Sequence, residues 1–309
     1  MSLRVVFFGT PEAAVPSLAH LLGSAHPVVA AVTAPDRPRG RGLEVQPSPV
    51  KRAALAAQLP VVQPPTLRDP SVQAELGDLG ADVFAVCAYG LILPQAVLDL
   101  PRLGALNVHF SLLPAYRGAA PVTWAILDGR PETGVTIMQM EAGLDTGPIL
   151  EQVAEPILPE DDTGSLEERL AVAGGGLLVD VLDRLEGGGV TPVAQDHAAS
   201  SYAAKITPAD ARIDWSWDAA RIARAVRAFR PRPGAWTTLA GRRLKLWRAK
   251  PGAAAAPGAP GTVAAGPDRE MLVATGGGSL VLDEVQPEGG RRMAGAEFLR
   301  GLRGDVSLE

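Results

Sequence analysis

The sequence predicts an α/β protein in two parts: a first domain built on a mainly parallel β-sheet, and a smaller second domain that forms a β-barrel. Along roughly the first 190 residues, short apolar runs alternate with segments of helical spacing, which is typical of strands joined by crossover helices. In the run 82–88 every residue after Asp82 is apolar, as in a strand buried on both faces of a parallel sheet. Beyond about residue 208, short strand candidates follow one another between glycine and proline turns, which favours a barrel.

The elements of the first domain follow from apolar spacing and from residues that start helices. Strands are expected at residues 4–8, 28–32, 61–62 and 82–88, and helices at residues 15–22, 50–58 and 72–79. Thr10 and Pro11 precede the first helix, where threonine can cap and proline can occupy the first turn. Residues 36–49 are rich in proline, glycine and arginine and predict a long loop. This order of elements is Rossmann-like.

The second domain is expected to follow a linker. We assign residues 1–188 to the first domain, 189–207 to the linker and 208–309 to the second domain. Residues 218–229 predict an amphipathic helix with Ile222, Val226 and Phe229 on its apolar side. Strands are expected at residues 236–239, 244–248, 261–263, 271–274 and 279–285. The number and spacing of these strands predict a small, OB-like barrel.

The composition excludes several classes of protein. The chain has 309 residues, 47% of them hydrophobic, with no signal-peptide pattern and no apolar stretch long enough to cross a bilayer. We therefore expect a cytoplasmic protein that does not enter a membrane. The single cysteine, Cys87, excludes an internal disulfide, and its apolar neighbours predict a buried core residue. The four histidines have no metal-ligand spacing, so no metal site is expected.

The two halves of the chain carry opposite charge. Residues 1–199 hold 12 Lys and Arg against 23 Asp and Glu, a net charge of −11. Residues 200–309 hold 17 against 11, a net charge of +6, and the segment 205–250 alone holds 12 against 3. A basic second half favours a polyanionic partner that is held mainly by that half. The alternative is an ordinary solvated helix face, because charge patterns alone are weak evidence.

A dinucleotide-binding site is the first candidate for the start of the chain, where a strand meets Gly9 and then a helix. The fingerprint requires further glycines at positions 11 and 14, but this chain has Pro11 and Ala14 there. The glycine triplets 174–176 and 276–278 lack the lysine and hydroxyl residue of a phosphate-binding loop. We therefore expect these triplets to be turns or helix-packing points.

Three polar side chains mark the most informative part of the sequence: Asn107, His109 and Asp145. In an open parallel sheet, ligands bind at the carboxyl ends of strands, and the segments after Phe8, Ala88 and Val108 are such ends. Taken singly, the three could be a turn amide, a strand-end histidine and a loop carboxylate. Their joint occurrence with the loop 111–118 favours a catalytic site.

These residues belong to a set of motifs in which the chain resembles the 10-formyltetrahydrofolate-dependent formyltransferases, and in particular the methionyl-tRNA formyltransferases. The motifs are Val5–Pro11, Asp36–Pro38, Gly40–Gly42, Pro47–Lys51, Asn107–His109, Ser111–Gly118, Gly143–Pro148 and Ala211–Trp215. The Asn, His and Asp set with its loop is common to the wider group. The segment 36–51 and the basic second domain narrow the resemblance to the enzymes that act on tRNA.

The resemblance implies that the amino group of methionine on initiator tRNA attacks the formyl carbon of the folate donor. Asn107 would donate a hydrogen bond to the oxyanion that develops there. His109 would donate a second hydrogen bond or move the proton shed by the amine, and Asp145 would orient the imidazole and accept the proton. No covalent enzyme intermediate is needed, because a neutral amine is itself a nucleophile.

The resemblance also implies two binding regions. The folate would lie in a mostly apolar slot. Its expected residues are Leu91, Leu93, Ser111, Leu112, Leu113 and Pro114. The tRNA would contact Arg37, Arg39, Arg41 and Lys205. Leu43-Glu44 and Ala115 depart from the basic residues usual in the family, which predicts weaker acceptor-stem contacts or their replacement by Arg39 and Arg52.

Two other functions stay open. A formyltransferase could use the same donor on a sugar-nucleotide amine or on glycinamide ribonucleotide, although a small acceptor needs neither the segment of net charge +9 nor the arginine-bearing loop. A non-catalytic RNA-binding protein of the same fold would have no use for Asn107, His109 and Asp145 together. We expect a monomer.

Overall fold

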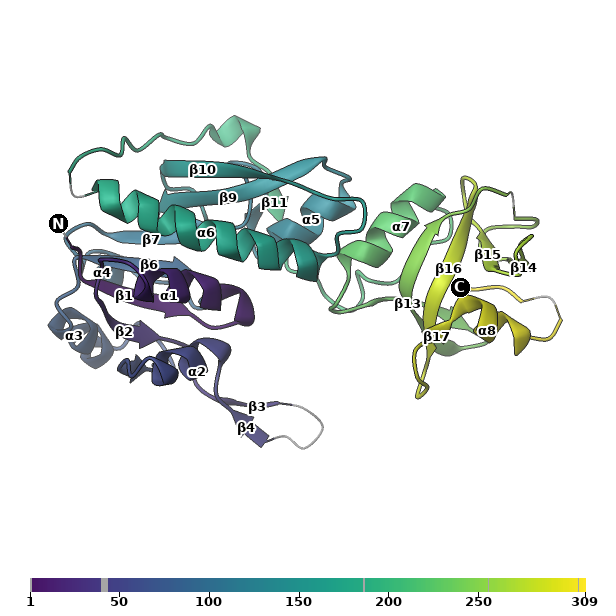
Figure 1. The fold of residues 1–309 in the computed structure, drawn as a ribbon, viewed down its shortest axis with the longest axis horizontal. Helices are drawn as coiled ribbons and strands as arrows, with labels where there is room; N and C mark the ends of the chain where they lie inside the picture. Colours follow the sequence, from purple (N-terminus) through teal and green to yellow (C-terminus); the bar gives the residue numbers. More distant parts are fainter. Residues whose placement is uncertain (1, 40–43, 186, 255, 305) are drawn as a thin grey trace. The chain divides into compact units, whose positions relative to one another are not determined.

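The computed structural model describes residues 2–39, 44–185, 187–254, 256–304 and 306–309. The chain forms two compact units, and neither is a single stretch of sequence (Figure 1). Unit 1 consists of Met1–Gly118, Glu132–Pro156 and Glu167–Ala203. Unit 2 consists of Ala119–Pro131, Ile157–Leu166 and Ala204–Glu309. Two short segments from within residues 1–188 thus belong to the same unit as the second predicted domain.

Unit 1 is built on a seven-stranded sheet in the order β10-β9-β7-β6-β1-β2-β5. The strands are β1 Val5–Gly9, β2 Val28–Val32, β5 Val61–Val62, β6 Val83–Cys87, β7 Ala105–His109, β9 Glu132–Gln139 and β10 Ile149–Pro156. The first five run parallel to one another, whereas β9 runs antiparallel to both of its neighbours, β7 and β10. The mainly parallel sheet is confirmed; its antiparallel edge has no counterpart among the predicted strands.

The helices of this region begin where the sequence supplies caps. They are α1 Val15–Leu22, α2 Pro49–Ala56, α3 Pro70–Asp78, α4 Gln95–Leu98 and α6 Thr163–Leu185, with a short 3-10 helix, η1, at Glu12–Ala14. Ser48 caps α2 by accepting from the Lys51 amide, and Asp69 caps α3 by accepting from the Ser71 amide. A proline directly follows each cap. For this reason α3 begins two residues earlier than its apolar spacing predicts.

The sheet is buried on both faces. On one face, Phe8 packs on Phe84 and Tyr89, with ring centroids 5.0 and 5.3 Å apart. Burial of each such side chain contributes about 1.5–3 kcal/mol to stability. On the other face, α6 comes close to β7 because Gly174 has no side chain to meet Val108. The first glycine triplet is therefore a helix-packing point, as predicted.

Cys87 ends strand β6 and is fully buried. Burial raises the pKa of its thiol to about 12, so the sulfur stays protonated at neutral pH. The prediction of an inert core residue is confirmed.

Residues 36–49 are not the irregular loop that their composition predicts. They contain a two-stranded hairpin, β3 Arg37–Arg39 and β4 Glu44–Gln46, whose connecting residues 40–43 lie outside the described part of the chain. The hairpin extends away from the main sheet next to α2 (Figure 1). Proline and glycine content misled the prediction, because two strands of three residues are too short to show an alternating pattern.

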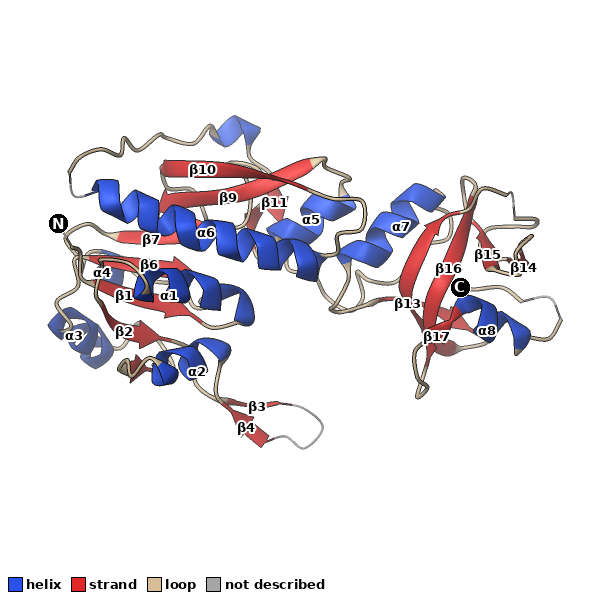
Figure 2. Cartoon of the chain, in the orientation of Figure 1, coloured by secondary structure: helices blue, strands red, loops and turns tan. Residues whose placement is uncertain are grey.

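Among the described residues, unit 2 contains an antiparallel half-barrel sheet and the helices α5 Pro121–Leu127, α7 Ala219–Ala228 and α8 Gly295–Arg300 (Figure 2). The sheet has the order β12-β13-β16-β15-β14, and β17 pairs with β16. The strands are β12 Ala235–Leu239, β13 Arg242–Pro251, β14 Val263–Ala265, β15 Met271–Ala274, β16 Ser279–Pro287 and β17 Met293–Ala294. The predicted barrel-like fold is confirmed.

The core of the half-barrel lies between the sheet and α7. Ile222, Val226 and Phe229 of the predicted apolar side are buried there, together with Leu244 and Leu246 of β13. The last four residues run between β12 and β14: the Leu308 amide donates to Gly261, and the Glu309 amide donates to Thr238, both at 2.9 Å. The carboxyl-terminal segment thereby covers the edges of two strands.

Candidate active site

Asn107 and His109 lie at the carboxyl end of β7, near the middle of the main sheet. They are two residues apart on one strand, so their side chains project from the same face. Val108 between them points to the opposite face, where α6 packs. The strand therefore presents an amide and an imidazole side by side, as the sequence predicts.

Asp145 reaches the same place from the turn that connects β9 to β10. Its carboxylate oxygen Oδ1 accepts from the Asn107 amide nitrogen Nδ2 at 3.4 Å, and Oδ2 lies 3.7 Å from His109 Nδ1. Oδ2 also accepts from the backbone amide of Gly118 at 2.9 Å. The structure thus brings the three predicted catalytic side chains together, although 36 residues separate His109 from Asp145 in sequence.

The backbone of this turn is unusual. Asp145 has φ of +52°, a left-handed conformation that is costly for a residue with a side chain. Gly147 follows, and a side chain there would meet the carbonyl of Gln139. Such strained geometry persists only where neighbouring groups hold it, and it often marks functional sites.

The orientation of His109 depends on Tyr116. Its Nε2 lies 2.9 Å from the Tyr116 carbonyl oxygen. Because a carbonyl oxygen can only accept, the proton of the neutral ring is on Nε2, and Nδ1 faces Asp145 with a free lone pair. His109 is 6% exposed, so little water competes for these contacts.

The loop 111–114 is tied down by internal hydrogen bonds. The Ser111 hydroxyl donates to the Ala115 carbonyl at 2.6 Å, and the Leu113 carbonyl accepts from the side-chain amide of Gln152 at 2.9 Å. The side chains of Ser111 and Leu113 are buried, whereas Leu112 and Pro114 stay partly exposed. The loop is therefore a fixed surface.

The segment after β6 contributes a second apolar surface. Leu93 is 4% exposed and belongs to the core, while Leu91 is partly exposed. Between them, Ile92 has 83% of its surface exposed, which the sequence reasoning did not single out. Of the six predicted folate contacts, Leu91, Leu112 and Pro114 retain side-chain surface that a ligand could cover.

Part of the predicted linker is built into this site. Strand β11, Tyr202–Ala203, pairs in parallel with β8, Arg117–Gly118. The Ser201 hydroxyl accepts from the Tyr116 amide at 2.8 Å, and the Ser201 carbonyl accepts from the Arg117 amide at 2.9 Å. Sequence reasoning missed these residues because partners 85 positions apart leave no local pattern.

Gln195, also from the linker, is a second missed residue. It is 6% exposed, and its amide nitrogen donates to the backbone carbonyls of Asp145 and Gly147 at 2.9 and 2.7 Å. Its oxygen accepts from Arg117, which also contacts His197 Nδ1 at 3.2 Å. Arg117 thus holds the side chain of Gln195.

The hairpin β3–β4 carries the predicted tRNA contacts of unit 1. Arg37 is exposed in β3, the backbone of Arg39 ends β3, and Arg41 lies outside the described residues. At the base of the hairpin, Lys51 Nζ donates to Asp36 and to Gln63 Oε1, the latter at 2.6 Å. A hydrogen bond from Lys51, and with a smaller effect one from Gln63, lowers the pKa of Asp36. The carboxylate of Asp36 therefore stays charged.

Some basic residues of unit 2 make contacts within the unit. Arg227 donates to the carbonyl of Asp161 at 2.7 Å, and Arg230 pairs with Asp162 at 2.8 Å, so both serve internal contacts of the unit. Burial lowers the pKa of Arg227. The alternative of an ordinary solvated helix face therefore does not describe Arg227. Lys205 is exposed.

A second group of cations stacks on tryptophans of the sheet. Arg243 lies over Trp236 at 4.2 Å, and Arg292 lies over Trp247 at 3.5 Å. Lys245 lies 5.5 Å from the Trp247 ring. Leu244 and Leu246 point into the core. Arg243 and Lys245 alternate with them along β13 and therefore point outward. We call Trp236, Arg243, Lys245, Trp247 and Arg292 the aromatic-basic face.

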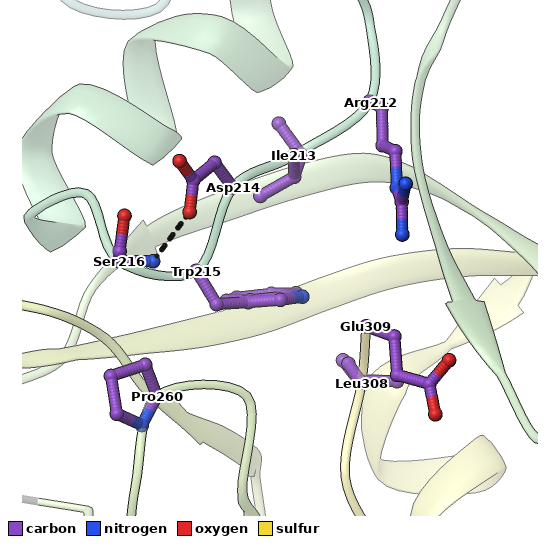
Figure 3. A pocket seen from close by; sticks show the side chains of 8 residues that line it. All are labelled: Arg212, Ile213, Asp214, Trp215, Ser216, Pro260, Leu308 and Glu309. Carbon is purple, nitrogen blue, oxygen red and sulfur yellow. Dashed lines mark hydrogen bonds between the residues drawn. The ribbon is translucent and has the colours of Figure 1, made fainter.

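Unit 2 also contains a cavity of about 490 Å³ (Figure 3). Its lining consists of residues 212–216, Pro260, Leu308 and Glu309. Two of these, Asp214 and Glu309, are acidic, and Asp214 already accepts from the Ser216 amide. The cavity is therefore a poor match for a polyanion, and none of the predicted site residues lines it.

Neither a metal centre nor a membrane span emerges from the described residues. No group of three or more His, Cys, Asp or Glu side chains among them is placed to hold a metal ion. None of the helices in this part of the chain is both long and apolar enough to cross a membrane.

A strand-end amide and imidazole, a carboxylate from a neighbouring turn and a Rossmann-like sheet define a class of group-transfer enzymes. Residues 3–182 match the formyl transferase family, and residues 205–303 match the formyl transferase C-terminal domain. The chain belongs to the formyl transferase family.

Two relatives in sequence carry the same name. A methionyl-tRNA formyltransferase from Thiobacillus denitrificans is 52% identical over 302 residues, which cover 97% of this chain and 96% of that protein. A methionyl-tRNA formyltransferase from Stutzerimonas stutzeri is 48% identical over 301 residues, or 97% of this chain and 95% of that protein.

Solved structures share the fold at lower identity. The N-formyltransferase of Helicobacter canadensis, in complex with folinic acid and dTDP-3-aminofucose, has a TM-score of 0.66 at 19% identity and covers 91% of this chain and 99% of its own. HypX from Aquifex aeolicus, in complex with tetrahydrofolic acid, has a TM-score of 0.64 at 18% identity. That alignment covers 97% of this chain but 47% of HypX. These likenesses concern the fold alone.

Proposed function

We propose that this chain transfers the formyl group of 10-formyltetrahydrofolate to the amino group of methionine on initiator methionyl-tRNA, and so supports translation initiation. The observation that carries the proposal is the convergence of Asn107, His109 and Asp145 at the carboxyl end of the central strand. The relatives at about half identity over nearly the whole chain support the choice of acceptor.

In this proposal each side chain has a separate task. One hydrogen of the Asn107 amide points toward Asp145, and the other can be donated to the oxyanion that develops when the amine attacks the formyl carbon. His109 can accept the proton shed by the amine, because its Nδ1 carries the free lone pair. The Asp145 carboxylate, 3.7 Å away, would stabilise the imidazolium so formed.

In the same proposal the folate donor covers the apolar surface of the loop 111–114 and of the segment 91–93. A pterin ring is flat and needs an apolar slot with a few fixed polar groups. Leu91, Leu112 and Pro114 supply partly exposed apolar surface, and the exposed Ile92 adds to it. The buried Ser111 and Leu113 would hold the loop in shape and would not touch the donor through their side chains.

Two basic surfaces support a tRNA acceptor. The aromatic-basic face offers the exposed guanidinium groups of Arg243 and Arg292, which lie over tryptophan rings, and such groups suit contacts with phosphates and bases. The hairpin β3–β4 offers Arg37 and Arg39 from a base fixed by Asp36 and Lys51. Lys205 and Arg41 complete the set of proposed tRNA contacts.

Two alternatives are less favoured. A small acceptor, such as a sugar nucleotide or glycinamide ribonucleotide, would not need the two basic surfaces. A non-catalytic RNA-binding protein would not need Asn107, His109 and Asp145. We also propose that the protein acts in the cytoplasm, where translation initiates, and as a monomer, because one chain carries both kinds of site.

The test incubates the purified protein with 10-formyltetrahydrofolate and methionyl initiator tRNA. Parallel reactions contain glycinamide ribonucleotide or an amino-sugar nucleotide as acceptor. We expect formyl-methionyl-tRNA as the main product, detected by acid-gel electrophoresis. Formylation of a control acceptor with none on the tRNA would overturn the proposal.

A further inference from the structure

Gln195 lies in the segment between the two family matches. Every hydrogen-bonding position of its side-chain amide is filled. Its Nε2 donates one bond to the Asp145 carbonyl and one to the Gly147 carbonyl. Its Oε1 accepts two bonds from Arg117, from Nε at 3.0 Å and from Nη2 at 2.7 Å. An amide has two donor hydrogens and room for two bonds at its oxygen, so each position is filled.

These four bonds fix the direction of the amide. If the oxygen and nitrogen were exchanged, the NH₂ group would face the Arg117 donors, and the oxygen would face two carbonyls. Both partners are shielded from water, with Gln195 at 6% and Arg117 at 9% exposure. In such surroundings, a broken hydrogen bond leaves a buried polar group without a partner.

The two carbonyls bracket the catalytic turn. They belong to Asp145, whose backbone is left-handed, and to Gly147, two residues later. The direction of the Asp145 side chain depends on the conformation of this turn. On its other side, the carboxylate accepts from the Gly118 amide, which directly follows Arg117. Arg117 therefore connects to the carboxylate by two routes, through Gln195 and through Gly118.

We infer that Arg117 and Gln195 are positioning residues: together they hold the turn 145–147 so that the Asp145 carboxylate stays against Gly118 and His109. Neither side chain is required to touch a substrate. The inference rests on the proposed function for its effect on turnover, but the placement of the carboxylate can be measured without any substrate. An error of about 1 Å in placing such a group can cost on the order of 100-fold in rate.

The decisive variant is Gln195→Glu. A glutamate keeps the contact with Arg117 and adds charge attraction, but it has no hydrogen to donate and places an oxygen against two carbonyl oxygens. The matched control is Gln58→Glu, the same chemical change at an exposed residue after α2. A residue that only stabilises the fold would change the melting temperature, whereas a positioning residue changes the geometry of Asp145.

Two readouts test the inference on the full-length protein. The first is hydrogen exchange of the Gly118 amide by NMR, which reports the bond from this amide to the Asp145 carboxylate. The second is steady-state formylation of methionyl-tRNA. For Gln195→Glu we expect faster exchange at Gly118 and a fall in kcat of about 100-fold with unchanged KM for both substrates. Gln58→Glu should behave as wild type in both.

If Gln195→Glu does not fold, Arg117→Lys provides the same test. Lysine keeps the positive charge but cannot direct two fixed N–H groups at one oxygen. Slow Gly118 exchange in a folded variant, or a kcat equal to wild type, would overturn the inference. If the wild-type protein formylates no methionyl-tRNA, the proposed function fails instead, and the exchange at Gly118 still decides the role of Gln195.

Discussion

The active site of unit 1 and the aromatic-basic face of unit 2 hold their polar groups in opposite ways. In the active site, side chains are buried and bonded to fixed backbone groups, as with His109 and the Tyr116 carbonyl. On the face, Arg243 and Arg292 are exposed and rest on tryptophan rings. Group transfer depends on a few groups held in fixed positions. The affinity for a polyanion is instead the sum of many contacts, none of which needs a precise geometry.

This comparison predicts the largest effect for Asn107→Ala. Removal of one oxyanion donor should lower kcat on the order of 100-fold. The fold should persist, because the bond from this side chain to Asp145 is long, at 3.4 Å. Steady-state kinetics and circular dichroism measure the two quantities, and Gln58→Ala serves as the control. If kcat stays near wild type while KM rises, Asn107 binds substrate and does not stabilise the transition state.

A smaller effect is expected when two cations of the aromatic-basic face are removed. The double variant Arg243→Gln with Arg292→Gln should weaken tRNA binding. The slope of log affinity against log salt concentration should become shallower by about 0.7–0.9 for each phosphate that the protein no longer neutralises. At saturating tRNA, kcat should not change. Filter binding at several salt concentrations provides the measurement.

The matched control for that variant is Arg291→Gln. Arg291 is exposed in the same unit but already pairs with Glu297 at 2.7 Å. Its removal should affect the salt dependence less than the removal of Arg292, its neighbour in sequence. Equal effects from both would mean that net charge, and not the stacked face, determines binding.

Arg37→Gln in the hairpin should have a smaller effect still, because it removes one exposed cation. We expect a few-fold weaker tRNA binding with unchanged affinity for the folate donor. Arg68→Gln, also exposed in unit 1, is the control and should bind tRNA as wild type does. An equal weakening in both variants would remove the hairpin from the proposed interface.

The smallest effect concerns the base of the hairpin. Hydrogen bonds from Lys51 and Gln63 hold the pKa of Asp36 below its usual 3.8. The ionised carboxylate therefore stabilises the folded state above about pH 4, and this contribution is lost as the pH falls through the lowered pKa. Lys51→Met should raise the pKa of Asp36, as measured by NMR titration of its carboxyl carbon.

Asp69 provides the internal control for that titration. Its pKa is also lowered, but by the backbone amide and hydroxyl of Ser71, so Lys51→Met should leave it unchanged. If the pKa of Asp36 does not rise in the variant, Lys51 does not hold the hairpin base.

Much of the first domain can be predicted because its signals are local. The helix 15–22 and the strands 28–32 and 61–62 have the same bounds in the sequence prediction and in the structure. The position of Asn107 and His109 follows from the rule that ligands bind at the carboxyl ends of parallel strands. Asp145 does not follow from this rule, because it comes from the turn between the antiparallel strands β9 and β10. The roles of these residues, like those of the folate and tRNA contacts, stay predictions.

What could not be predicted depends on contacts between distant residues. Gln195 meets Arg117 across 78 positions, and neither residue stands in a pattern that indicates the other. Helical spacing assigns the arginines of α7 to one face, but it does not show what packs against that face. In the structure, Arg224 and Arg227 contact the carbonyls of Leu127 and Asp161, which come from much earlier in the chain.

The pairing of β8 with β11 has a consequence for recombination of such chains. The glycines at 187–189 look like a natural junction at which evolution or an engineer could exchange one second domain for another. A crossover there would replace Gln195 and Ser201, which bond to the turn 145–147 and to Tyr116. A crossover after Ala203 would carry these residues along with the first domain. Chimaeras joined at the second point should keep catalytic geometry that those joined at the first point lose.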